Sequence, residues 1–496
     1  MLSDDILYMT VSELGPQIRR KKIRPVELTE SYLARLEKLG PKVGAVAKLT
    51  PELALEQAHA AEKEIRSGHY RGPLHGIPFG AKDLLATKGI PTTWGAPPFK
   101  DQVFDFDATV IARLREAGAI LVAKLAMIEL AGGGGYTNGN ASLQGPSRCP
   151  FNLEHWAGGS SSGPGASVPS ALVGFAIGSE TLGSIVTPAA FSGVSGLRPT
   201  YGRVSRYGAM ALSWTMDKLG PMCRSADDCG LVLAAIAGAD PADPTSLDAA
   251  FRWKPARKRS SKKKPLAGKK IGVMRPNFEQ GTPGAGDPEV GAAYAAALDV
   301  LRGLGATLED TELPDMPYGT VASAMIAAEG ATIFRPLIES GRVMELVDER
   351  QKTGLITSLT FSATDYLDAC RVRAEMLPAL GKVFEKFDAL VAPSRNTPAS
   401  RLDADLGGAP PPRREGERPR EERPAQPPGA GNRQALLAAS NVAGQPAISV
   451  PCGFTKEKNL PIGIQIVADA LREDVCIELA AAYQSATEWH KKRPNL

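Results

Sequence analysis

Serine hydroxyls are concentrated in two short glycine-rich stretches near the middle of the chain. The first reads Gly-Gly-Ser-Ser-Ser-Gly over residues 158–163, and the second reads Gly-Ser-Glu-Thr-Leu-Gly-Ser over residues 178–184. Small residues leave room for a substrate and expose backbone amides, so this pattern is typical of a turn around a nucleophilic serine. No Gly-Lys-Ser/Thr sequence closes the run, which excludes a phosphate-binding P-loop. No Gly-x-Ser-x-Gly elbow surrounds Ser160 or Ser184, which disfavours an α/β-hydrolase.

A serine nucleophile needs a base, because its protonated hydroxyl attacks poorly. Of the five histidines only His155 lies near the serines in sequence, and a loop hydrogen-bonding role suits it better than that of a base. Lys82 is the stronger candidate, because it lies between apolar residues on a segment that reads as a buried strand, and burial lowers the pKa of an ammonium group. Considered alone, Lys82 could equally be an ordinary lysine paired with Asp83.

Several separated segments resemble the amidase signature family, and they occur in the order found in that family. The resemblance covers residues 10–485. Besides the two serine stretches, it rests on Gly72–Asp83 (GPLHGIPFGAKD), Asp388–Pro393 (DALVAP), Asn441–Gly453 (NVAGQPAISVPCG) and Leu460–Gln465 (LPIGIQ). It implies a single large α/β domain with a central mixed, twisted sheet covered by helices.

The resemblance also implies a catalytic triad of two serines and a lysine. Ser184 is implied as the nucleophile, Ser160 as a bridging serine preceded by a cis peptide bond, and Lys82 as the base. The separation of 24 residues between the two serines matches the spacing in the family. The oxyanion hole is implied to consist of the backbone amides of Thr181, Leu182, Gly183 and Ser184. No cofactor and no metal are implied.

Two departures from the family pattern bear on the substrate. Leu182 replaces a glycine and Val186 an arginine in the turn around Ser184, which removes one local charge that could bind an acid. We therefore expect a neutral, largely apolar amide, anilide or carbamate (urethane). Four glycines at 132–135 followed by a tyrosine replace a more usual Met-Gly-Ser-Ser segment and predict a roomier pocket. The candidate pocket residues are Met127, Leu130, Gly132, Gly133, Tyr136 and Trp156.

Three functions remain open at this point. The first is a stand-alone serine hydrolase of linear amides, with urethanase or aryl-acylamidase activity and an acyl- or carbamoyl-enzyme intermediate. The second is the amidase subunit of a glutamyl/aspartyl-tRNA amidotransferase, which a requirement for a partner subunit and ATP would favour. The third is a non-catalytic binding protein on the same fold. For the first, the expected partners are the small-molecule substrate and a second copy of the chain in a homodimer, without nucleic acid or a membrane.

Helical and strand patterns alternate along the chain, which predicts the elements that position these residues. Thr10 and Glu13 form a capping-box pattern, and Pro25 marks the start of a second helix. Helices are further predicted over 51–67, 107–117 and 289–304, and short strands over the segment ending at Lys82, over 120–123 and over 307–308. We expect one domain over residues 1–496, with a helical N-terminal part over 1–70.

Composition excludes several classes of protein. The 496 residues are 43% hydrophobic and 23% charged, which is incompatible with general disorder. The net charge of +4 gives no general argument for nucleic acid, and six cysteines without a CxxC pair argue against a metal site. No apolar segment long enough for a membrane helix and no signal peptide is found, so we expect a cytoplasmic protein. A basic surface loop over 253–270 and a mobile Pro/Arg/Glu-rich insertion over 407–431 complete the expectations.

Overall fold

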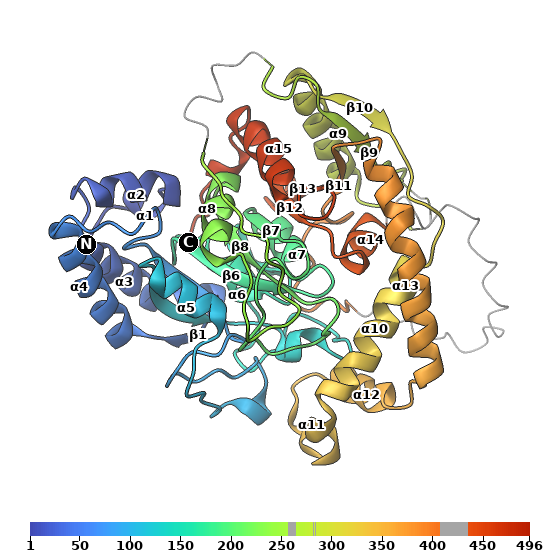
Figure 1. The fold of residues 1–496 in the computed structure, drawn as a ribbon, viewed down its shortest axis with the longest axis horizontal. Coiled ribbons are helices and arrows are strands. Elements are labelled where there is room, and N and C mark those ends of the chain that lie inside the picture. The colour runs from blue at the N-terminus through green and yellow to red at the C-terminus, as the bar shows by residue number, and fades with distance from the viewer. Residues whose placement is uncertain (256–263, 281, 283, 407–434) are drawn as a thin grey trace.

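The computed structural model in Figure 1 describes residues 1–255, 264–280, 282, 284–406 and 435–496. Among these residues, eleven strands form one sheet. The strands of this sheet are β1 (Val46–Leu49), β2 (Pro78–Lys82), β3 (Ile120–Leu125), β6 (Phe175–Glu180), β7 (Ser195–Arg198), β8 (Lys218–Cys223), β9 (Lys270–Val273), β10 (Thr307–Asp310), β11 (Ala389–Pro393), β12 (Ala447–Phe454) and β13 (Pro461–Val467). Two more, β4 (Arg148–Cys149) and β5 (Asn152–Trp156), pair separately.

The sheet has the order β1-β3-β2-β6-β8-β7-β12-β13-β11-β9-β10. β2 runs parallel to both β3 and β6, and β9 runs parallel to both β10 and β11. The other neighbours are antiparallel. The sheet is therefore mixed, which confirms the predicted fold class.

Helices flank this sheet. They are α1 (Asp4–Leu7), α2 (Val11–Arg19), α3 (Pro25–Val43), α4 (Pro51–Arg66), α5 (Thr109–Glu116), α6 (Ser162–Ser167), α7 (Val186–Ser192), α8 (Ala226–Ile236), α9 (Pro288–Gly303), α10 (Tyr318–Ile333), α11 (Arg335–Glu339), α12 (Glu349–Ser358), α13 (Ala363–Phe384), α14 (Leu436–Val442) and α15 (Glu473–Ser485). Figure 1 shows α1–α4 gathered near the N-terminus, whereas α10, α12 and α13 lie on the opposite side of the molecule. None of the described helices is long and apolar enough to cross a membrane.

Both faces of strand β3 are buried under helices. Successive side chains of a strand point to opposite faces. On β3, Leu121 packs in one hydrophobic cluster with Leu114 of α5, whereas Ile120 and Val122 pack in another with Leu36 of α3. Strands buried on both faces read as continuous apolar runs, which is why the segment after residue 119 was recognisable.

The predicted elements occur close to their expected bounds. The Thr10 side chain accepts the Glu13 amide while the Glu13 carboxylate accepts the Thr10 amide at 2.8 Å, which confirms the capping box. α3 begins at Pro25 as predicted, and α4 ends at Arg66, one residue early. The N-terminal 70 residues are mostly helical but also supply β1, the edge strand beside β3. Residues 256–263 of the basic loop and all of the insertion over 407–431 lie outside the described residues.

Candidate active site

Lys82 ends the central strand β2, between β3 and β6, and its side chain is fully buried. Its Nζ lies 2.7 Å from Ser160 Oγ and 2.9 Å from Ser179 Oγ. Burial lowers the pKa of Lys82 to about 7, although the negative charges of Asp217 and Glu180 oppose this shift. An amine with a pKa in this range is neutral in a large fraction of molecules near pH 7, and a neutral amine can accept a proton. The alternative pairing of Lys82 with Asp83 is not found: Asp83 pairs with Lys124, at 3.2 Å.

Ser160 lies in the loop between β5 and α6. The peptide bond between Gly159 and Ser160 is cis, the geometry that the resemblance implied. The Ser160 carbonyl accepts the Ile128 amide at 3.1 Å, which ties this loop to the segment after β3. A Cβ at residue 159 would lie 2.6 Å from the Trp156 ring, so the close approach of backbone and ring requires glycine here.

Ser184 lies in the turn between β6 and α7. Gly183 precedes it with a φ of +85°, a backbone conformation that favours glycine. The side chains of Ser160 and Ser184 are not hydrogen-bonded to each other in the part of the chain that the structure describes, but the Ser161 amide donates to the Ser184 carbonyl at 3.3 Å. Serine hydroxyls rotate freely, and catalytic hydrogen bonds often tighten only when substrate binds. The structure thus joins Lys82 directly to Ser160, with Ser184 on the neighbouring turn.

A buried carboxylate holds this turn in place. Burial alone would raise the pKa of Glu180, but the positive charges of Arg198 and Lys218 lower it to about 2. The ionised carboxylate accepts the amides of Ile185 and Val186 at 2.7 and 2.9 Å and pairs with Arg198 at 2.8 Å. The local sequence does not indicate this role of Glu180, because its partner Arg198 belongs to another strand.

The four amides of the implied oxyanion hole are available to a ligand. Within the described residues, none of the backbone N–H groups of Thr181, Leu182, Gly183 and Ser184 donates to a protein acceptor. The Thr181 hydroxyl donates to Asp217 at 2.5 Å, which fixes the first residue of the turn. Unpaired amides converging beside a serine can stabilise an oxyanion.

Ser184 opens into a cavity of about 390 Å³. Three of the predicted pocket residues lie in its wall, namely Gly132, Tyr136 and Trp156. Met127, Leu130 and Gly133 are absent from that wall. Met127 and Leu130 are fully buried in the hydrophobic core. A Cβ at Gly133 would lie 2.8 Å from Leu212 and 3.3 Å from Phe334, so neighbouring side chains crowd that position.

Two arginines line the same cavity, and the sequence did not indicate either of them. Arg350 comes from α12 and Arg395 from the segment after β11, and both side chains are exposed. Neither guanidinium forms an ion pair with a described carboxylate. Among the described residues, no histidine lines this cavity, and no cluster of acidic, histidine or cysteine side chains could hold a metal. We expected a neutral substrate because Val186 replaces an arginine in the turn around Ser184. The two arginines that line the cavity come from segments distant from that turn in sequence.

Comparison with known proteins gives consistent matches along the whole chain. The Amidase family model matches residues 27–477. The chain is 36% identical over 520 residues to a glutamyl-tRNA(Gln) amidotransferase subunit of Moorella thermoacetica, covering 99% of each. It is similar to a solved bacterial aryl acylamidase (TM-score 0.81, 26% identity, 98% of each chain). It is also similar to the peptide amidase of Stenotrophomonas maltophilia (TM-score 0.78, 28% identity, 98% of each chain).

Proposed function

This chain belongs to the amidase signature family, and from that membership we propose that it hydrolyses a C–N bond of a small amide that carries an acidic group. The observation that carries the acidic group is the pair of arginines, Arg350 and Arg395, that line the cavity beside Ser184 and form no ion pair with a described carboxylate. A carboxylate held by guanidinium groups forms charge-assisted hydrogen bonds, which are stronger than neutral ones.

The proposed reaction begins with attack by Ser184 Oγ on the amide carbon. The Ser184 proton passes to Ser160 while the Ser160 proton passes to neutral Lys82, and the carbonyl oxygen becomes an oxyanion held by the amides of the 181–184 turn. The C–N bond then breaks as the leaving nitrogen takes a proton from Ser160, which regains one from Lys82. Water attacks the acyl-enzyme by the same proton path and releases the acid. The contact of 2.7 Å between Lys82 Nζ and Ser160 Oγ supports this path.

A second candidate is the amidase subunit of a tRNA-dependent amidotransferase. Identity of 36% over nearly the full length of both chains to one such protein favours it. An acidic amide suits this candidate too, because glutamine carries a carboxylate. A neutral, apolar amide, anilide or carbamate is the weaker alternative, since it offers no negative charge to the two arginines, which pair with no carboxylate in the part of the chain that the structure describes. The amidotransferase candidate differs from a stand-alone hydrolase in needing a partner protein.

The test compares two amides of equal chain length with the purified full chain. Ammonia release from 5-amino-5-oxopentanoate, which carries a carboxylate, is measured beside release from pentanamide, which does not. We expect a higher kcat/KM for 5-amino-5-oxopentanoate than for pentanamide. Arg350→Gln or Arg395→Gln should lower kcat/KM for 5-amino-5-oxopentanoate about 10-fold or more and leave that for pentanamide unchanged. Ser184→Ala should abolish turnover of both.

Each other outcome selects a different function. Faster hydrolysis of pentanamide would overturn the acidic substrate and favour the neutral one. Glutamine hydrolysis that appears only with partner proteins, ATP and glutamyl-tRNA would favour the amidotransferase. Undiminished turnover by Ser184→Ala would overturn the role of Ser184, and absence of turnover under all conditions would favour a binding protein.

A further inference from the structure

Lys82 has a second hydroxyl partner besides Ser160. Ser179 lies on β6, and its Oγ is 2.9 Å from Lys82 Nζ. Ser161 fixes the backbone of Ser179 from both sides: its hydroxyl accepts the Ser179 amide at 3.2 Å and donates to the Ser179 carbonyl at 3.0 Å. Ser161 follows Ser160 directly, so one short loop sets the positions of both hydroxyl partners of the lysine.

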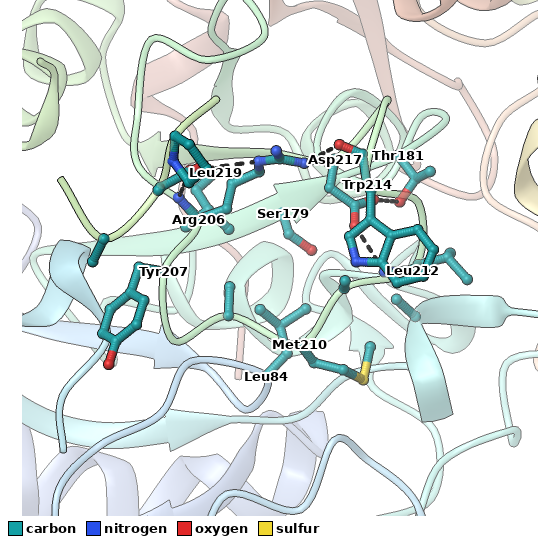
Figure 2. A pocket seen from close by; sticks show the side chains of 16 residues that line it. Leu84, Ser179, Thr181, Arg206, Tyr207, Met210, Leu212, Trp214, Asp217 and Leu219 are labelled. Carbon is teal, nitrogen blue, oxygen red and sulfur yellow. Dashed lines mark hydrogen bonds and ion pairs between the residues drawn. The ribbon is translucent and has the colours of Figure 1, made fainter. Parts of the chain in front are cut away.

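Ser179 also lines a second cavity, on a different side of the site from Ser184. This cavity measures about 230 Å³, and Ser184 is absent from its wall. Figure 2 shows Ser179 beside Asp217 and Arg206, with its hydroxyl pointing away from the Arg206 side chain.

The two cavities share part of their walls. Ala131, Thr181 and Leu212 line both of them. Ser184 lines only the cavity of about 390 Å³, and Ser179 lines only the cavity of about 230 Å³. A change confined to the side chain of residue 179 therefore leaves the wall of the Ser184 cavity as it is.

We propose, on the basis of the function proposed above, that Ser179 is a positioning residue that turns the lone pair of neutral Lys82 toward Ser160. A neutral amine has two N–H donors and one lone pair. The lone pair must face the Ser160 hydroxyl to accept its proton, so an acceptor for one N–H group selects the productive rotation about the last side-chain bond. Ser179 Oγ is that acceptor, and the geometry of strand β6 holds it there.

The electrostatic surroundings of Lys82 stay the same when Ser179 changes. The charges that act on Lys82 are those of Asp217, just before β8, and Glu180, at the end of β6; both raise its pKa against the lowering caused by burial. On the adjoining strand, Lys124 is paired with Asp83. A change in the titration of Lys82 on substitution of Ser179 therefore reports the lost hydrogen bond.

Ser179→Thr and Ser179→Val form a matched pair. Threonine and valine have nearly the same shape, but only threonine keeps the hydroxyl. We expect Ser179→Thr to recover most of the parent kcat and Ser179→Val to lose about 10-fold or more, with KM within twofold of the parent. A hydrogen-bond acceptor stabilises the ammonium form of lysine more than the neutral amine, so removing it lowers the pKa of Lys82. The rise of kcat with pH should therefore shift to lower pH in Ser179→Val but not in Ser179→Thr.

A second measurement does not depend on amidase activity. Cyanate carbamylates neutral amines: the lysine nitrogen adds to the carbon of isocyanic acid, and a proton moves to its nitrogen to give a urea. Mass spectrometry of the peptide containing residue 82 then gives the pH midpoint of Lys82 in each variant. A midpoint at lower pH in Ser179→Val than in Ser179→Thr is expected. Equal midpoints, or equal kcat in the two variants, would overturn the proposal, whereas an inactive parent with shifted midpoints would overturn only the proposed function.

Discussion

Lys82 and Lys124 lie on the neighbouring strands β2 and β3, and both side chains are fully buried, but their partners differ in kind. Lys82 contacts the hydroxyls of Ser160 and Ser179. Lys124 contacts the Thr92 hydroxyl at 2.6 Å and pairs with the Asp83 carboxylate at 3.2 Å. Burial lowers the pKa of both amines, but at Lys124 the adjacent carboxylate raises it again. Burial alone therefore does not distinguish the two lysines; within the described residues, only Lys124 of the two has a carboxylate at ion-pair distance.

The largest expected effect separates the two lysines by activity. Lys82→Met should lower kcat/KM for the acidic amide by about 10³-fold, because the serine then lacks its base. Lys124→Met should keep most of the parent activity when folded protein is compared. Steady-state ammonia release from both variants checks this. Comparable losses in the two variants would show that the difference in partners has no functional meaning.

The next largest effect concerns the contribution of Lys124 to the free energy of unfolding. Lys124→Met leaves the Asp83 carboxylate buried without a cation, so we expect the free energy of unfolding to fall by about 3–5 kcal/mol. The double variant Asp83→Asn/Lys124→Met removes the uncompensated charge and should be more stable than the single variant. Urea denaturation of the parent and the two variants measures both differences. A single variant as stable as the parent would show that the pair is not needed for stability.

The third effect concerns pH and distinguishes a neutral from a charged buried lysine. The pKa of Lys82 is about 7 in the folded chain, against its ordinary value of 10.5 when unfolded. Between these values the unfolded chain binds more protons, so the stability contribution of Lys82 rises as pH rises from 7 to 10.5. The stability of the parent relative to Lys82→Met should increase over that window. Thermal unfolding at several pH values tests it, and a flat difference would mean that Lys82 stays charged.

The local parts of this site were predictable from the sequence. The two glycine-serine stretches, the apolar segment ending at Lys82 and the strand after residue 119 are encoded within a few residues, because turns and buried strands have local signatures. The alternative partner for Lys82 was Asp83, its neighbour in sequence. The structure instead pairs Asp83 with Lys124, since β2 and β3 are adjacent in the sheet.

The parts of the site that depend on long-range packing were not predictable. Arg350 and Arg395 reach the Ser184 cavity from α12 and from the segment after β11, and no local pattern marks either of them. Met127 and Leu130 are close to the site in sequence, yet their side chains point into the core. Small shifts in backbone direction decide whether a residue close in sequence to a cavity-lining residue faces the cavity or the core. The hydrophobic character of the residue does not encode these shifts.

The smallest expected effect compares the hydroxyl partners of the two lysines. Threonine and valine have nearly the same shape, so Thr92→Val removes the oxygen that accepts from Lys124 Nζ, together with its long contacts to the Leu85 and Ile90 carbonyls at 3.5 and 3.4 Å. A hydrogen bond to a charged group contributes about 1.5–3 kcal/mol, and we expect a loss of stability in that range with kcat/KM within twofold of the parent. Ser179→Val makes the same kind of change beside Lys82, and there the expected loss falls on kcat. If Thr92→Val lowered kcat as much as Ser179→Val does, the loss in Ser179→Val would not be specific to the hydroxyl beside Lys82. The loss of any buried hydroxyl that contacts a lysine would then have the same effect on kcat.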